Sequence, residues 1–232
     1  METVLSRLHY ELVYGLIHRG VCPTNSEISA SLRSSVPEVE SLLLKLEAIH
    51  GVVLHPHACE PWVVHPVSTT PTLNWVEGRH ASWWAPCIWC AFGIATLAAG
   101  EVRIHTRYAA EGEPLIIAVY NGQPVDSLNT LVHFAVPAAH AWDNVRRHCA
   151  LLLPFHSDVE IDDWCRRHRQ PRGEAVSLTA TAELARAWYG THARRDWHKW
   201  SVAEAQQIFH SCGLRSAFWN LNAQSGTESG AF

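Results

Sequence analysis

The stretch Ser82-Trp-Trp-Ala-Pro-Cys-Ile-Trp-Cys-Ala-Phe-Gly-Ile94 leads from a tryptophan-rich extended segment into an alanine-rich helix that ends near Gly100. Cys87 and Cys90 form a C-x-x-C motif at the start of this helix, directly after Pro86. Residues three apart on a helix lie on the same face. The helix dipole and the free N–H groups of the first turn favour thiolate over thiol. The pattern is therefore typical of a soft-metal site or a thiol nucleophile.

A single C-x-x-C motif is found in several kinds of protein. A thioredoxin-like motif would follow a clear strand in a βαβ unit, and a zinc site usually has a second cysteine or histidine pair at close spacing. The sequence shows neither pattern around Cys87 and Cys90. Free cysteines are also often buried for packing alone. Spacing by itself therefore favours neither a functional nor a structural role for this pair.

Upstream of this stretch the sequence predicts a small helical module. Apolar residues at helical spacing and capping-box patterns predict three helices, and two short β-rich pieces follow them. The expected helices cover residues 3–19, 25–32 and about 36–49, and the expected strands cover 51–54 and 62–65. Three helices and a hairpin predict a winged-helix-like module over residues 1–66.

The charge distribution argues against a nucleic-acid partner. The chain of 232 residues has 18 Lys and Arg against 22 Asp and Glu, a net charge of −4. The third expected helix carries Glu38, Glu40 and Glu47 against one lysine, Lys45. A helix that faces DNA phosphates should be basic. We therefore expect the N-terminal module to be structural.

Composition also indicates the class of protein. A hydrophobic share of 47% is that of a globular chain, and no apolar run is long enough to span a bilayer. The N-terminus has acidic residues and no apolar signal stretch, so the 7 cysteines indicate intracellular thiols. We expect a cytoplasmic protein with no membrane partner.

The rest of the chain mixes strands and helices. Expected strands cover 102–108, 115–120, 130–136 and 150–155, and expected helices cover 138–147, 181–189 and 202–211. A further helix is expected after the Ser157 and Glu160 cap, with Ile161, Trp164 and Cys165 on one face. This pattern predicts an α+β core around a small sheet over residues 67–222, followed by a flexible tail over 223–232.

Of the other cysteines, Cys149 differs from the rest. It lies at an expected helix-to-strand junction, where rigid neighbours can aim a side chain into a cleft. His148 beside it is expected to point to the opposite face and to have no role. A structural role is favoured for four cysteines on or beside apolar segments: Cys22, Cys59, Cys165 and Cys212. Two of the nearby tryptophans, Trp83 and Trp89, are expected to cover the core.

Several motifs together resemble the organomercurial (alkylmercury) lyase family. The similar segments are His65-Pro-Val-Ser, Trp84-Ala-Pro-Cys-Ile-Trp-Cys-Ala-Phe-Gly-Ile94, Arg146-Arg-His-Cys149 with the Asp163-Trp164 that follows, and Glu204-Ala-Gln-Gln-Ile-Phe209 with the later Gly213-Leu and Phe218-Trp219. The resemblance covers most of the chain. It implies a helical N-terminal part and a mixed lyase core.

The resemblance also implies an active site of two cysteines and one aspartate. Cys87 matches the first cysteine, which opens a C-x-x-D motif in the family, and Cys149 matches the second. Cys90 stands in the place of the aspartate, which the family implies to be the proton-handling residue. The sequence therefore keeps the soft ligands and replaces the carboxylic acid with a third sulfur.

The resemblance implies cleavage of a carbon–mercury bond to Hg(II) and a hydrocarbon, with Cys87, Cys90 and Cys149 as catalytic and metal-binding residues. No cofactor is expected; the soft metal is substrate, product or ligand, and cellular thiols are expected to accept it. Two alternatives remain open. One is a protein that holds Cu, Zn or Hg in a site of three thiolates. The other is a lyase-fold enzyme that uses a cysteine nucleophile on a non-mercurial small molecule.

Overall fold

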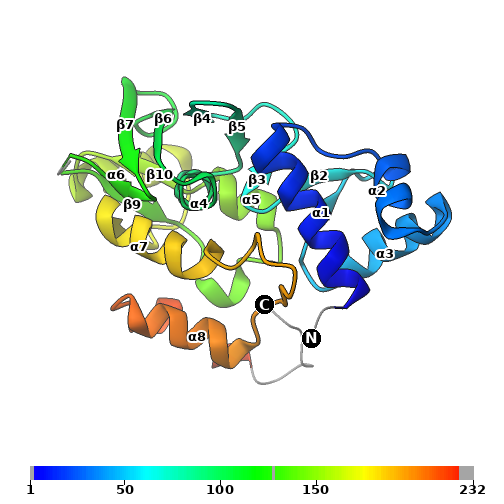
Figure 1. Ribbon diagram of the computed structural model, residues 1–232. Coiled ribbons are helices and arrows are strands. Elements are labelled where there is room, and N and C mark those ends of the chain that lie inside the picture. Colours follow the sequence, from blue (N-terminus) through cyan, green and yellow to red (C-terminus); the bar gives the residue numbers. More distant parts are fainter. Residues whose placement is uncertain (1–2, 127–128, 225–232) are drawn as a thin grey trace.

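The computed structural model describes residues 3–126 and 129–224, and it begins with three capped helices (Figure 1). These are α1 (Val4–Arg19), α2 (Asn25–Leu32) and α3 (Val36–Ala48). Each is opened by a capping box in which the N-cap and N3 residues bond reciprocally. The three expected helices are thereby confirmed.

The expected hairpin is also present, and it continues into a larger sheet. Strand β1 (Val53–Leu54) pairs antiparallel with β2 (Pro61–Val64). Strand β2 then pairs with β3 (Val67–Ser68), so the hydrogen-bonded ladder runs on past residue 66. The turn between β2 and β3 carries His65.

The sheet is larger than the sequence predicts. It has eight antiparallel strands in the order β1-β2-β3-β5-β4-β6-β7-β8. The strands after β3 are β4 (Asn74–Gly78), β5 (Ser82–Ala85), β6 (Glu101–Arg107), β7 (Pro114–Tyr120) and β8 (Gln123–Pro124). Strands β6 and β7 were expected, whereas β4 and β5 were not. Trp75 lies opposite Trp84 in the ladder that joins β4 and β5, and such aromatic cross-strand pairs stabilise a sheet.

One helix packs between this sheet and a second helix. Helix α4 (Ile88–Ala98) lies below β4 and β5 in Figure 1, with α7 (Leu178–Tyr189) beneath it. Helix α4 is apolar on nearly every face because both sides are covered. Gly93 permits the close approach, since a Cβ there would lie 2.9 Å from Cγ of Tyr189 on α7.

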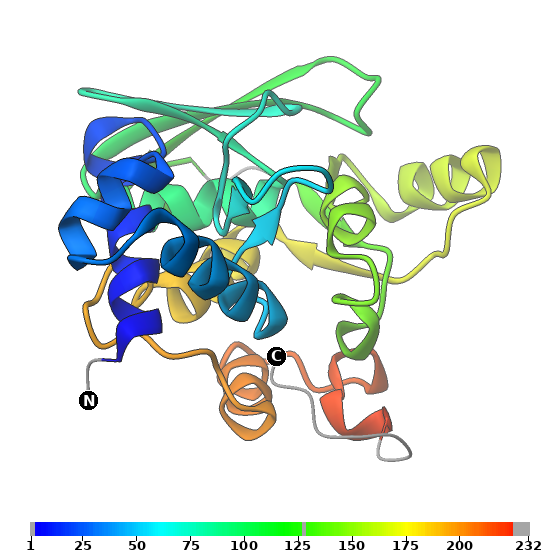
Figure 2. The same cartoon turned by 90° about the vertical axis from the view of Figure 1, so that its right-hand side faces the viewer.

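A second, three-stranded sheet has β9 (Leu131–Phe134) between β10 (Leu153–Phe155) and β11 (Glu174–Ser177). Helix α6 (Asp158–His168) packs on β10 through Ile161, and α8 (Val202–Ser211) packs on α7. Figure 2 shows the N-terminal helices on one side of the molecule and α6 on the other. The α+β class and these helices are confirmed.

The helix expected over residues 138–147 is wrong. The chain forms a 3₁₀ turn at Ala138–His140 and then a separate helix, α5 (Val145–Ala150). Asn144 starts α5 because its side chain accepts the backbone N–H of Arg147. Cys149 therefore lies within the last turn of a helix.

The chain ends in two further 3₁₀ turns, Ala217–Trp219 and Leu221–Gln224. Most of the expected tail, residues 225–232, lies outside the described residues. Within the described ranges no helix has the length and hydrophobicity needed to cross a membrane.

Candidate active site

The first part of the site is built by the start of α4. Cys87 is the N-cap of this helix, and its sulfur accepts the backbone N–H of Cys90 at 3.3 Å. The sulfur of Cys90 lies 3.4 Å from the hydroxyl of Tyr189, at the end of α7. Cys87 and Cys90 are fully buried. The C-x-x-C motif therefore faces inward, as helix geometry predicts.

Helix α5 and the β2–β3 turn supply the second part. The Cys149 sulfur lies 3.9 Å from Nε2 of His65, and it also hydrogen-bonds with the Cys87 sulfur. The ligand atoms of His65, Cys90 and Cys149 all lie within 4.8 Å of one another. Segments far apart in the sequence thus bring three sulfurs and one imidazole together.

The protonation of Cys87 is set by its neighbours. Burial alone would raise the pKa of this thiol, because a charged sulfur is poorly solvated there. Hydrogen bonds from Cys149, from the Cys90 side chain and from the Cys90 backbone outweigh burial and bring the pKa well below its ordinary value. Cys87 is therefore the thiolate of the site.

The other acidic groups keep their protons. The hydrogen bond to Cys87 is the largest cause that raises the pKa of Cys149, and burial is the largest cause that raises the pKa of Cys90 and of Tyr189. Burial, together with the charge of Lys199, lowers the pKa of His65 to about 4. At neutral pH the site thus holds one thiolate, two thiols and a neutral imidazole.

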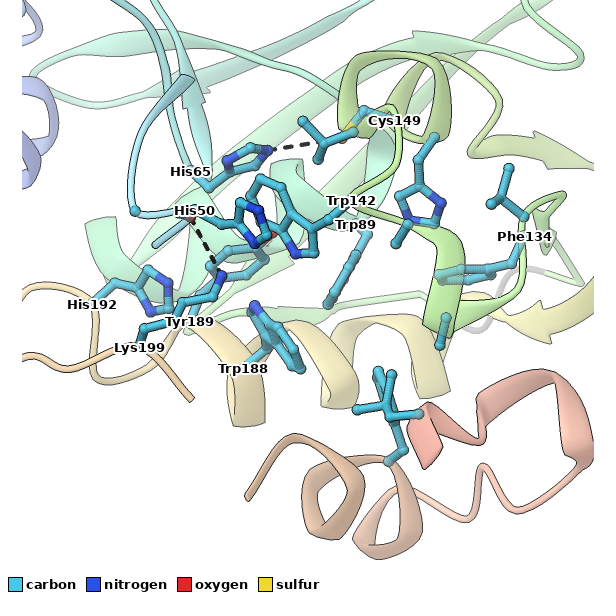
Figure 3. Close-up of a pocket in the computed structure, with 18 of the residues that line it drawn as sticks. His50, His65, Trp89, Phe134, Trp142, Cys149, Trp188, Tyr189, His192 and Lys199 are labelled. Atoms are coloured by element: carbon cyan, nitrogen blue, oxygen red, sulfur yellow. Dashed lines mark hydrogen bonds between the residues drawn. The ribbon is translucent and has the colours of Figure 1, made fainter. Parts of the chain in front are cut away.

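A cavity of about 60 Å³ lies beside Cys149. Its volume is several times that needed for one water molecule, about 10–15 Å³. Figure 3 shows Cys149 and His65 at one side of it and Trp89, Trp142, Trp188 and Tyr189 among its walls. Aromatic rings therefore wall the space beside Cys149.

The structure brings together the three cysteines that the sequence singles out, and the four cysteines expected to be structural do not line this cavity. Trp89 packs against the core as expected, and it also lines the cavity, where its indole N–H has no hydrogen-bond partner among the described residues. The expectation that His148 points away from Cys149 is wrong. His148 lines it with Cys149, because both lie on a helix rather than on opposite faces of a strand. Trp83 covers the core as expected, donating to the Leu16 carbonyl at 2.7 Å.

The sequence did not assign His65 or Tyr189 to the sulfur site, or Lys199 to the cavity beside it. Each reaches it by long-range packing, which no local pattern reports. His65 stands directly before a proline at the end of a β-rich piece, and its sequence position shows only that it lies in a turn.

Residues 67–190 match the family model for alkylmercury lyase. Among solved structures, the crystal structure of the mercury-bound form of MerB2 superposes with a TM-score of 0.61 at 19% sequence identity. That alignment covers 84% of this chain and 100% of the other, and it supports the shared fold. No curated protein sequence matches the chain.

The matched segment contains Cys87, Cys90, Cys149 and Tyr189, and His65 lies just before it. The match spans more than half of the 232 residues. This chain therefore belongs to the alkylmercury lyase family and is an alkylmercury lyase-like enzyme.

Proposed function

We propose that this protein cleaves carbon–mercury bonds by thiolate-assisted protonolysis, releasing a hydrocarbon and retaining Hg(II) on its cysteines. The observation that carries the proposal is the convergence of three sulfurs in different protonation states beside a cavity lined by aromatic rings. Soft thiolates suit a soft metal, and the neighbouring thiols supply the proton that the departing carbon needs.

The first step is ligand exchange at mercury. The Cys87 thiolate attacks R–Hg–X, forms the S–Hg bond and displaces X⁻, which leaves with the electron pair of its former bond. Cys87 is suited to this step because its sulfur already carries the negative charge at the helix N-terminus. The organic group R then occupies the cavity beside Cys149.

The second step breaks the carbon–mercury bond. The Cys90 thiol gives its proton to the carbon of R, the bond electrons form the new C–H bond, and the Cys90 sulfur binds mercury. The products are R–H and Hg(II) bound by Cys87 and Cys90, so atoms and charge balance. Cys90 takes this role because it stands where the family has its carboxylic acid, and burial keeps it protonated.

Cys149 adds a third sulfur to the metal. Its thiol proton can pass to Nε2 of His65, 3.9 Å away, because burial keeps that imidazole neutral. Thiolate coordination by three residues strengthens retention of Hg(II), and a cellular thiol would be the acceptor that removes it. The same geometry favours a second candidate function, a soft-metal protein that binds Hg(II), Cu(I) or Zn(II) without cleaving an organic group.

Incubation with phenylmercury and an excess of a small thiol tests the proposal. Benzene is measured by gas chromatography and protein-bound mercury by elemental analysis. We expect wild type to release benzene and to retain mercury. Cys87→Ser and Cys149→Ser should each lose mercury binding or benzene release, because a hydroxyl is a poor ligand for mercury. Cys165→Ser and Cys212→Ser are matched controls, because these sulfurs lie away from the cavity.

Each other outcome identifies a different function. Tight stoichiometric binding of mercury without benzene would support the soft-metal protein. Absence of both mercury binding and benzene release would indicate an enzyme with a non-mercurial substrate. Equal loss in all four variants would mean that the fold depends on its thiols and that the site is misplaced.

A further inference from the structure

The cavity beside Cys149 has an unusual charge composition. Besides its aromatic rings, it is lined by five imidazoles and one amine, those of His9, His50, His65, His148, His192 and Lys199. Among the described residues that line it, none is an aspartate or a glutamate. A pocket for a purely hydrocarbon group has no need of such side chains.

Several of these groups have no partner for a polar atom. Nδ1 of His9, His148 and His192 and the indole N–H of Trp89 are buried without a hydrogen-bond partner in the described part of the chain. The three histidines are only 1%, 6% and 7% exposed, respectively. Buried polar groups in folded proteins are normally satisfied. A ligand that carries polar atoms would satisfy them.

Of the residues that the structure describes, Lys199 is the one lysine that lines the cavity. Its Nζ donates to the His50 carbonyl at 3.3 Å and lies 4.4 Å from the centre of the Trp142 ring. No carboxylate of the described residues forms an ion pair with it. Burial lowers the pKa of this ammonium to about 7, as expected for a cation without a counterion.

The lysine and the cysteines lie at different places along the cavity. Figure 3 shows Lys199 and His192 well away from Cys149, with His50 and Trp142 between them. A ligand held by mercury at the sulfurs would extend past these rings before it reached the ammonium. Flat aromatic walls and a terminal cation favour a ring that ends in an anionic group.

We propose that this cavity is a subsite for the organic group of the substrate, and that it selects aromatic groups bearing a carboxylate, which pairs with Lys199. The inference rests on the proposed function for the site of the reaction, whereas the subsite is a separate property of the cavity. The carboxylate supplies the missing counterion for Lys199.

Binding without mercury tests the subsite alone. Benzoate and the neutral benzyl alcohol are titrated into the full chain, and the fluorescence of the cavity tryptophans is followed. We expect benzoate to bind more tightly than benzyl alcohol. Lys199→Met should lower the affinity for benzoate by about tenfold or more, which is the effect of losing one charged hydrogen bond. Lys45→Met, on the exposed face of α3, is the matched control.

Turnover provides the second measurement. We expect kcat/KM to be higher for 4-carboxyphenylmercury than for phenylmercury, and Lys199→Met to remove that preference while phenylmercury is still cleaved. The accompanying thiol is varied between mercaptoacetate and 2-mercaptoethanol. A preference that follows the carboxylate of the thiol instead of that of the aryl group would overturn the assignment.

The two proposals fail separately. Benzoate binding that depends on Lys199, with no cleavage of either arylmercurial, would refute the lyase reaction and leave the subsite in place. Cleavage of both arylmercurials at equal rates, with benzoate bound no better than benzyl alcohol by wild type, would refute the subsite. The wild-type comparison holds even if Lys199→Met fails to fold.

Discussion

Acidification should destabilise this protein through a histidine buried in the cavity wall. His9, on α1, is 1% exposed, and its ring stacks on Trp197 with centroids 3.6 Å apart. Burial, assisted by the charge of Lys199, lowers the pKa of His9 from 6.5 to about 3. The folded state therefore excludes a proton that the unfolded chain takes up readily.

The sign and size follow from linkage. Because the folded pKa lies below the unfolded value, the free energy of unfolding falls as pH drops below about 6.5, by about 1.4 kcal/mol per pH unit until the folded pKa is reached. Between pH 7 and pH 5 His9 alone should remove about 2 kcal/mol. This is a large part of the about 5–15 kcal/mol that stabilises a typical protein. Lowered pKa values at His65 and His192 act in the same direction.

Urea unfolding of wild type and His9→Phe at pH 7 and pH 5 checks this value. Phenylalanine keeps an aromatic ring against Trp197 and cannot titrate, and any packing cost applies at both pH values. We expect the loss between pH 7 and pH 5 to be about 2 kcal/mol smaller in the variant than in wild type. Equal losses in the two proteins would refute the reasoning, because His9 would then not exclude its proton in the folded state.

Two further predictions concern the sulfur site. Cys90→Asp should keep or raise benzene release and lower the affinity for Hg(II), because a carboxylate is a weaker ligand for a soft metal and can still carry a proton; loss of cleavage in a folded variant would contradict this. Gly93→Ala should cost about 1–3 kcal/mol in urea unfolding and slow benzene release, because its Cβ would lie 2.9 Å from Cγ of Tyr189 and from Cβ of Pro66. Unchanged stability and rate in that variant would mean that α4 and α7 need not approach so closely.

Local signals explain which parts of the fold could be predicted. Helix α8 begins and ends where the sequence predicts, because Ser201 and Glu204 form a capping box and apolar spacing defines one face. Strand β5 was missed because its Trp-Trp pair follows no clean alternation, and its partner β4 is needed to define it. Helix α5 was misplaced because the Asn144 cap interrupts a segment of continuous helical propensity.

The residues of the sulfur site were likewise predictable only in part. The spacing of Cys87 and Cys90 placed both at one helix N-terminus, which is a local feature, whereas the family resemblance gave them a function. The roles expected for Cys149 and for the substituted position 90 came from the family resemblance. His65 reaches Cys149 across 84 residues of sequence, and Lys199 reaches the His50 carbonyl across 149. Contacts of that range are determined by packing of the whole chain and leave no local pattern.

The cavity also has a genetic consequence. Its sulfur end, with Cys149 and Tyr189, lies within the segment shared with the family, residues 67–190. His9, His50 and Lys199 come from the flanking stretches on either side of that segment. If the two proposals hold, mutations at His9, His50 or Lys199 would alter which molecules enter the cavity and would leave Cys87, Cys90 and Cys149 unchanged. Selectivity and most of the reactivity would then be encoded in different stretches of one gene, and each could evolve under its own selection.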